Sequence, residues 1–172
     1  MDLKKHIREV ADFPKVGISF KDLTTLFKNT EALNFTVKSI VEEFENKSIT
    51  KVLGIESRGF IFGGIVAYEL GAGFVTVRKK GKLPSETISE SYDLEYGTDS
   101  VEIHSDAITE DDVVLIHDDL LATGGTAYAT LQLVKRKGVK NIYFSFICDL
   151  EFIDTERKQE VKEHKIQVLV KY

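Results

Sequence analysis

The chain has 172 residues, of which 42% are hydrophobic and 30% are charged, a composition that fits one globular domain with a full core. Its net charge of −5 disfavours general electrostatic attraction to nucleic acid or to an anionic membrane. No apolar stretch approaches the roughly 18 residues of a membrane span, and the charged start "MDLKKHIREV" lacks the apolar region of a signal peptide. The single cysteine, Cys148, excludes an internal disulfide, so we expect a cytoplasmic protein.

The first thirty residues predict little regular structure. Residues 3–11 have the apolar spacing of a short amphipathic helix, with Leu3 and Ile7 on one face. The next segment, residues 11–27, contains Pro14 and Gly17, which interrupt regular elements. We therefore expect an ordered loop there.

From residue 30 onward, the pattern predicts alternating helices and strands. In chain order these are a helix over 33–44 that starts after Thr30 and Glu31, a strand over 51–55, a helix over 59–71, a strand over 73–81 that runs into a basic turn, an aperiodic polar segment over 82–94, a hairpin over 93–104, a strand over 111–118, a helix over 126–137, a strand over 141–150 and a last strand over 166–172. Alternating helices and continuously apolar strands predict an α/β fold, with a mostly parallel central sheet and helices on both faces.

Polar motifs follow three of the predicted strands. They read "GIESRG", "VRKKGK" and "HDDLLATGGT". Open parallel sheets bind ligands at the carboxyl ends of their strands. The three motifs therefore predict one binding site at that edge of the sheet.

The stretch "VVLIHDDLLATGGTA", residues 113–127, carries the clearest chemistry. Gly124 and Gly125 precede a predicted helix, and a helix N-terminus with flexible glycines favours phosphate binding through backbone N–H groups. Asp118 and Asp119 would repel a phosphate bound close by, so they suit hydroxyl donors or a divalent cation. Together they indicate a ribose 5-phosphate; the alternative for the string alone is an acidic turn before a helix.

The sequence "LIHDDLLATGGT" resembles the signature with which type I phosphoribosyltransferases bind phosphoribosyl pyrophosphate (PRPP). The segments "DFPKVGISFKDLT", "GIESRGFIFG", "VRKKGKLPSET" and "YDLEYGTDSVEIHSDAI" are similar to adenine phosphoribosyltransferases in order and spacing. The resemblance runs from about Phe13 to Leu150. It implies the type I phosphoribosyltransferase fold as a single domain over residues 1–172, with a base-recognition hood over 1–30 and a flexible catalytic loop and hairpin over 82–100.

The resemblance also implies roles for particular residues. Asp118 and Asp119 would bind the ribose hydroxyls, and the residues around the 5-phosphate would be Ala122, Thr123, Gly124, Gly125 and Thr126. The remaining contacts with PRPP or AMP would come from Ser57, Arg58, Arg78, Lys82 and Tyr96. The adenine contacts would come from Ser19, Phe20, Lys21 and Leu120, with Lys21 standing where an Arg is frequent in the family.

Catalysis is assigned by the same resemblance. Glu95 would handle a proton or stabilise charge near the base, while Arg58 and Lys82 would stabilise the leaving pyrophosphate. Residues 83–97 would form a lid that excludes water. From the sequence alone, Glu95 could also be an ordinary residue at a strand edge, and the basic run at residues 78–82 could be a solvated charge cluster.

The implied reaction joins adenine and PRPP to give AMP and pyrophosphate. Mg²⁺ would enter bound to the pyrophosphate and ribose of PRPP, without a direct protein ligand. The resemblance further implies a homodimer, in which Lys79 and Lys80 face solvent or the neighbouring subunit. We expect His117 to be a packed, hydrogen-bonded side chain and not a catalyst.

Three alternatives remain open from the residues. A phosphoribosyltransferase for 6-oxopurines often has a lysine on the strand after the signature, and "YFSFICDLEF" contains none. A ligand-sensing regulator would add a basic DNA-binding domain, for which we find no room before "DFPKVG". A catalytically inactive binding protein has the same residue types.

Overall fold

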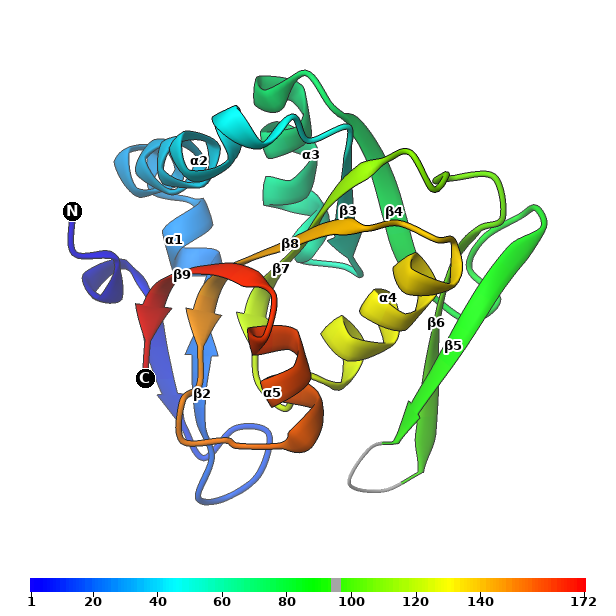
Figure 1. Ribbon diagram of the computed structural model, residues 1–172. Coiled ribbons are helices and arrows are strands. Elements are labelled where there is room, and N and C mark those ends of the chain that lie inside the picture. The colour runs from blue at the N-terminus through cyan, green and yellow to red at the C-terminus, as the bar shows by residue number, and fades with distance from the viewer. Residues whose placement is uncertain (94–96) are drawn as a thin grey trace.

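The computed structural model describes residues 1–93 and 97–172, and a seven-stranded sheet forms its centre (Figure 1). Five strands run parallel: β3 (Lys51–Ile55), β4 (Gly73–Lys79), β7 (Val113–Leu121), β8 (Asn141–Asp149) and β9 (Lys165–Lys171). An antiparallel hairpin of β5 (Thr87–Asp93) and β6 (Thr98–His104) continues the sheet beside β4. The strand order is β5-β6-β4-β3-β7-β8-β9. This confirms the predicted α/β fold with a mostly parallel sheet.

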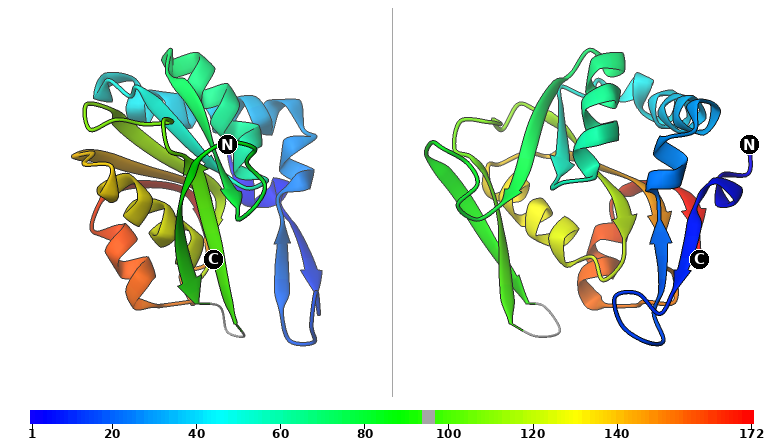
Figure 2. Two further views of the ribbon diagram at one scale, coloured as in Figure 1. Left: turned by 90° about the vertical axis from the view of Figure 1, so that its right-hand side faces the viewer. Right: turned by 180° about the vertical axis from the view of Figure 1, so that it is seen from behind.

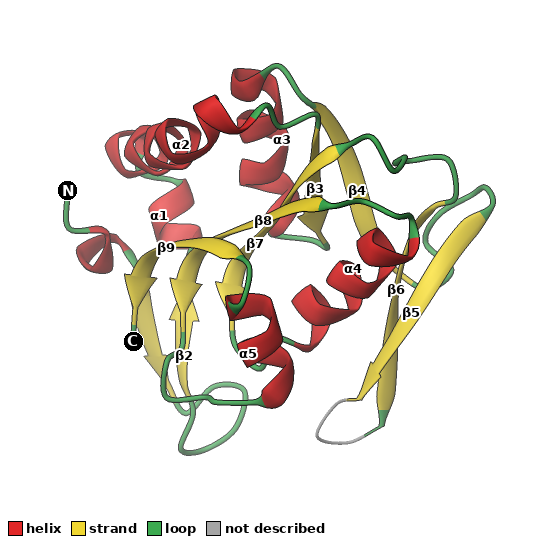
Figure 3. Cartoon of the chain, in the orientation of Figure 1, coloured by secondary structure: helices red, strands yellow, loops and turns green. Residues whose placement is uncertain are grey.

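Helices cover both faces of the sheet (Figure 3). On one face lie α2 (Thr30–Phe44) and α3 (Gly59–Leu70), and on the other lie α4 (Gly125–Arg136) and α5 (Glu156–Lys162). Of the helices predicted from the sequence, α2, α3 and α4 are confirmed, and the one over residues 3–11 is not. Helix α5 was not predicted, because it is short and mostly charged.

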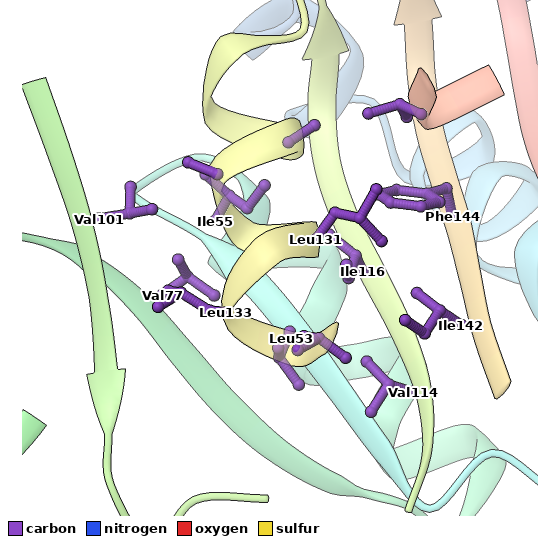
Figure 4. Close-up of a cluster of buried hydrophobic side chains, with 14 of the residues drawn as sticks. Leu53, Ile55, Val77, Val101, Val114, Ile116, Leu131, Leu133, Ile142 and Phe144 are labelled. Atoms are coloured by element: carbon purple, nitrogen blue, oxygen red, sulfur yellow. The ribbon is translucent and has the colours of Figure 1, made fainter. Parts of the chain in front are cut away.

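The main core lies between the sheet and α4 (Figure 4). Leu53, Ile116 and Phe144 from the central strands pack with Leu131 and Leu133 of α4, and each of these five side chains is fully buried. Because helices cover both faces, side chains pointing either way from a central strand are buried. That arrangement explains why β3, β7 and β8 are continuously apolar in sequence.

The N-terminal segment differs from the sequence prediction. Instead of a helix over 3–11, a 3-10 helix η1 (Leu3–His6) is followed by strand β1 (Arg8–Ala11). Strand β1 pairs antiparallel with β2 (Ser19–Asp22), and the short helix α1 (Thr24–Phe27) follows, so the expected loop over 11–27 is also wrong in part. The strands stabilise each other across the pair, where the Arg8 guanidinium lies 2.6 Å from Asp22 Oδ2. A second 3-10 helix, η2 (Glu45–Lys47), follows α2.

The polar segment over 82–94 is also more regular than expected. Its second half is β5, which pairs with β6 from Thr87 opposite His104 to Asp93 opposite Thr98. The predicted hairpin is therefore confirmed, but its first strand begins earlier than the sequence indicated. Tyr92 of β5 is only 6% exposed, although it stands in the segment that the sequence analysis described as polar and aperiodic. In the described part of the chain, no helix is long and apolar enough to cross a membrane.

Candidate active site

The three polar motifs meet at one edge of the sheet. Strands β4, β3 and β7 are neighbours and run parallel, so the segments after them lie side by side. The β1–β2 hairpin and the β5–β6 hairpin extend past this edge on two sides (blue and green in Figure 2). The predicted convergence of the motifs is therefore confirmed, and the two hairpins border it.

The loop of residues 122–126 connects β7 to α4 and surrounds a small cavity. The cavity holds about 80 Å³ and is lined by Asp118 and residues 120–127. Gly124 is the N-cap of α4 and has a φ of +78°, a left-handed conformation that favours glycine. Since glycine has no side chain to cap the helix, the first N–H groups of α4 remain available to a ligand. This geometry suits a phosphate.

Close packing also requires both glycines of the 122–126 loop. A Cβ at Gly124 would lie 2.8 Å from the Cα of Lys158, and a Cβ at Gly125 would lie 3.0 Å from Cδ2 of Tyr92. Lys158 belongs to α5 and Tyr92 to β5. The loop is thus held between β5, which lies in the expected lid, and α5, which sequence analysis did not connect with the site.

Asp118 and Asp119 lie near the C-terminal end of strand β7 and not after it. Asp118 Oδ1 accepts a hydrogen bond of 2.8 Å from the backbone N–H of Asp119. Burial raises the pKa of both carboxyls, and the neighbouring charge of Asp119 raises the pKa of Asp118 further. A half-buried and a buried acid with raised pKa values, beside a phosphate-sized cavity, are typical of a functional site.

Arg58 provides the positive charge nearest to this acid pair. Its Nε lies 2.8 Å from Asp119 Oδ2, and its guanidinium lies 5.8 Å from the ring centre of Phe20. The next residue, Gly59, begins α3 against β7, where an added Cβ would lie 2.9 Å from the His117 carbonyl oxygen. Gly59 therefore permits close packing of helix and strand. The peptide bond between Glu56 and the exposed Ser57 is cis.

Two carboxylates organise the basic turn after β4. Glu56 Oε2 accepts hydrogen bonds from Arg78 Nε at 3.0 Å and from the N–H of Lys79 at 2.9 Å. Burial alone would raise the pKa of Glu56, but these two hydrogen bonds outweigh it and hold that pKa below its usual value. Glu102 is 4% exposed and accepts hydrogen bonds from the N–H groups of residues 81–83. The Lys82 side chain remains exposed at the edge of the site.

Lys79 is tied to the β5–β6 hairpin. Its ammonium lies 2.9 Å from Asp99 Oδ2, and the Tyr92 hydroxyl donates to the same oxygen at 3.3 Å. The hydrogen bond with Lys79 lowers the pKa of Asp99 and raises that of Lys79. Since the Tyr92 ring packs on Gly125, one chain of contacts joins the basic turn to the 122–126 loop.

The four residues expected at the base are distributed unevenly. Phe20 approaches Arg58 as described, and Leu120 lies beside the cavity. Ser19 is exposed, and Lys21 is 7% exposed, with its ammonium 2.8 Å from Glu9 and 4.2 Å from the Tyr172 ring centre. The Lys21 side chain is therefore engaged with Glu9 and Tyr172.

His117 is fully buried behind the acid pair. Its ring lies 6.4 Å from that of Phe62, and neither ring nitrogen has a hydrogen-bond partner within residues 1–93 and 97–172. Burial lowers its pKa to about 4, against a weaker opposing effect of the Ser145 backbone. The expectation of a packed side chain is confirmed, and the Ser145 backbone is its polar neighbour.

Sequence analysis missed five residues that shape the site: Glu56, Tyr92, Glu102, Thr155 and Lys158. Glu56, Tyr92 and Glu102 stood inside quoted motifs without a role of their own, whereas Thr155 and Lys158 lie outside every motif and act through contacts between distant segments. The expected catalytic residue Glu95 and the expected ligand contact Tyr96 lie outside the described residues. In the part of the chain that is described, no group of three or more His, Cys, Asp or Glu side chains is arranged to hold a metal ion.

Comparison with known proteins gives consistent matches over most of the chain. Residues 22–170 match the family model of the phosphoribosyl transferase domain. An adenine phosphoribosyltransferase from Phocaeicola vulgatus is 59% identical over 148 residues, which are 86% of this chain and 85% of that protein. The crystal structure of adenine phosphoribosyltransferase from Rhodothermus marinus is 48% identical with a TM-score of 0.90, covering 99% of this chain and 96% of that one. An APRTase from Giardia lamblia complexed with 9-deazaadenine is 39% identical with a TM-score of 0.91, covering 99% and 96%.

Proposed function

Since this chain belongs to the phosphoribosyl transferase family, and within it to the adenine phosphoribosyltransferases, we propose that it transfers the 5-phosphoribosyl group of PRPP to adenine, giving AMP and pyrophosphate. The observation that carries this function is the acid pair Asp118–Asp119 beside the glycine loop at the end of β7. This short segment contains both the hydrogen-bond acceptors for a sugar diol and a binding site for a phosphate. The reaction serves purine salvage.

PRPP binds with its 5-phosphate in the 122–126 loop and its ribose hydroxyls on Asp118 and Asp119. The N–H groups at the start of α4 donate to the phosphate, and the hydroxyls of Thr123 and Thr126 add donors. The ribose hydroxyls donate to the two carboxylates, which are acceptors only, and stronger ones, in the ionised form. The raised pKa of Asp118 supports this role. Ionised Asp118 destabilises the free protein, and hydroxyl groups of a bound ribose would stabilise that ionised form.

Pyrophosphate leaves from the anomeric carbon as adenine's ring nitrogen forms the new bond. Arg58, Arg78 and Lys82, with Ser57, bind the departing group, and Glu56 fixes the direction of the Arg78 guanidinium. The charge that develops on the leaving group is the largest in the reaction, so its stabilisation dominates the catalysis of this step. The donor set fits an anion and not a resident cation, so Mg²⁺ is brought by PRPP, where it adds charge neutralisation on the pyrophosphate.

Adenine is recognised at strand β2. Within the described residues β2 pairs with β1 alone, which leaves its other edge for contacts with the edge of a purine. Phe20 packs on the ring, Leu120 lies beneath it, and Ser19 and Lys21 contribute backbone groups. Glu95 and Tyr96 complete the site from the β5–β6 hairpin, with Glu95 supplying a proton-transfer or electrostatic contribution.

The protein acts as a homodimer in the cytoplasm. The exposed side of α3 supports the dimer, because this helix is apolar nearly all round, yet Ile61 and Tyr68 are 42% and 83% exposed. A helix of this composition is typically buried on every side. A second copy of the chain would cover it, and sedimentation velocity at micromolar concentration measures the mass of the assembly.

A product assay with three bases tests the function. The protein is incubated with Mg²⁺, PRPP and either adenine, hypoxanthine or guanine, and the nucleotide formed is measured by chromatography. We expect AMP from adenine and little product from the two 6-oxopurines. Product from hypoxanthine or guanine, with none from adenine, would overturn the specificity, and absence of every product would overturn the reaction.

A further inference from the structure

The segment after β8 packs against the 122–126 loop. The hydroxyl of Thr155 donates a hydrogen bond of 2.6 Å to the carbonyl oxygen of Thr123. The same hydroxyl accepts the N–H of Lys158 at 3.1 Å and so caps α5. The Thr155 hydroxyl therefore donates a hydrogen bond to the 122–126 loop and accepts one from α5.

Lys158 fixes the position of this segment in the core. Its side chain is 1% exposed, and its ammonium donates to the carbonyl oxygens of Leu150 at 2.6 Å and Ile153 at 2.9 Å. It also lies 2.6 Å from Asp149 Oδ1, while Lys162 lies 2.7 Å from Oδ2 of the same buried carboxylate. A lysine buried this deeply is stable only with such a full set of partners. The backbone of Lys158 is consequently a rigid surface under Gly124.

We propose that Thr155 is a positioning residue for PRPP: its hydroxyl bonds the carbonyl of Thr123 and holds the 122–126 loop on α5, in the shape that binds the 5-phosphate. The proposal rests on the function proposed above. Thr123 is exposed and Gly124 is a left-handed glycine, so the loop's own residues restrict it little. Donors that are already directed at the ligand bind it more tightly than donors that must first be ordered.

The contacts of Thr155 predict which of the two substrates its loss affects. Thr155 touches the loop through one carbonyl oxygen, and no contact links it to Phe20 or Lys21 of strand β2 among the hydrogen bonds of the described chain. Its loss should therefore weaken the binding of PRPP and leave the binding of adenine unchanged. A residue that mattered only for overall stability would not separate the two substrates.

The test compares Thr155→Val with Thr155→Ser. Valine has nearly the same shape but cannot bond Thr123, so we expect KM for PRPP to rise about threefold to tenfold, the effect of one lost hydrogen bond, with KM for adenine unchanged. Serine keeps the hydroxyl and should restore the wild-type KM. Equal changes in both KM values, no change in either, or failure of serine to restore binding would overturn the proposal.

A matched control separates the loop contact from the stability of α5. Val161 is fully buried in the main core cluster, and Val161→Ala weakens the same helix without removing the bond to Thr123. We expect a lower melting temperature for Val161→Ala with KM for PRPP unchanged. A rise in KM for PRPP like that of Thr155→Val would show that helix stability is the cause, and the proposal would be wrong.

Binding of ribose 5-phosphate, measured by titration calorimetry, keeps this proposal distinct from the proposed function. If the wild-type protein forms no nucleotide but binds ribose 5-phosphate, the function fails while the positioning role is still judged from the dissociation constants. Thr155→Val should then raise the dissociation constant of ribose 5-phosphate about threefold to tenfold. A wild-type protein that forms no nucleotide and binds no ribose 5-phosphate overturns both.

Discussion

His117 is expected to make the folded protein sensitive to acid, and His117→Leu should remove much of that sensitivity. The ring is fully buried beside Phe62, and neither nitrogen has a hydrogen-bond partner in the described chain. Leucine is of similar size and has no polar atom to bury. At pH 8, where the imidazole is neutral, the variant should therefore be at least as stable as the wild type.

The magnitude follows from the two pKa values of the imidazole. Burial lowers the pKa of His117 from 6.5 to about 4 in the folded state. Between these values the unfolded chain binds a proton that the folded chain does not, so the free energy of unfolding falls as pH falls. The loss from this residue amounts to about 2 kcal/mol between pH 8 and pH 5, and approaches about 3 kcal/mol below pH 4.

Urea unfolding of both proteins at pH 8, 6.5 and 5 measures this difference. The carboxylates that also titrate in this range are present in both chains, so their contributions largely cancel in the comparison. We expect the wild type to lose about 2 kcal/mol more than His117→Leu between pH 8 and pH 5. Parallel stability curves for the two proteins would refute the assignment of a buried, neutral imidazole.

Three substitutions test the site itself. Asp118→Asn should raise KM for PRPP by about tenfold to a hundredfold, because a charged acceptor is lost, and initial rates measure this effect. The same substitution should stabilise the free protein at pH 7, because the raised pKa means that ionised Asp118 destabilises the fold. Urea unfolding measures this second effect. Gly124→Ala should lower the free energy of unfolding by about 1–3 kcal/mol and weaken PRPP binding. The reason is that alanine is strained at a φ of +78° and its Cβ meets the Lys158 backbone. An unchanged midpoint of urea unfolding would contradict this expectation. Glu95→Ala should slow single-turnover AMP formation by on the order of 10²–10⁴, and unchanged single-turnover rates would show that its role is misassigned.

The parts of the fold that the sequence predicted are those with strong local signals. Helix α2 has regular apolar spacing over four turns, and its Asn29 cap accepts the N–H of Ala32. The central strands are apolar on both faces, which fixes their type and their parallel arrangement. Such elements need no knowledge of distant residues.

The parts that were mispredicted depend on distant partners. Residues 8–11 become a strand because residues 19–22 pair with them, and the apolar residues Leu3 and Ile7 gave a helical spacing that the pairing overrides. Likewise, residues 87–93 form a strand because β6 pairs with them along its whole length. A single-sequence pattern contains local propensity and not the identity of a partner strand.

The candidate site shows the same division. Asp118, Asp119 and the 122–126 loop form one continuous segment, so their chemistry could be predicted together. Thr155 is more than thirty positions away, and nothing in "FIDTERK" indicates that a hydroxyl there bonds the loop. The same holds for Glu102, a buried carboxylate inside a strand whose partners are backbone N–H groups of the basic turn.

The acid pair lies on a strand that is paired on both sides, and this arrangement has a physical reason. Asp118 and Asp119 are buried next to each other, and burial raises the pKa of each, so the ionised pair destabilises the free protein at neutral pH. Such a pair persists only if the surrounding structure holds it, and here β7 is paired on both sides by β3 and β8. Arg58 offsets part of the charge, at 2.8 Å from Asp119. Hydroxyl groups that donate to both carboxylates would stabilise the ionised form, so sugar binding and ionisation of the pair favour each other.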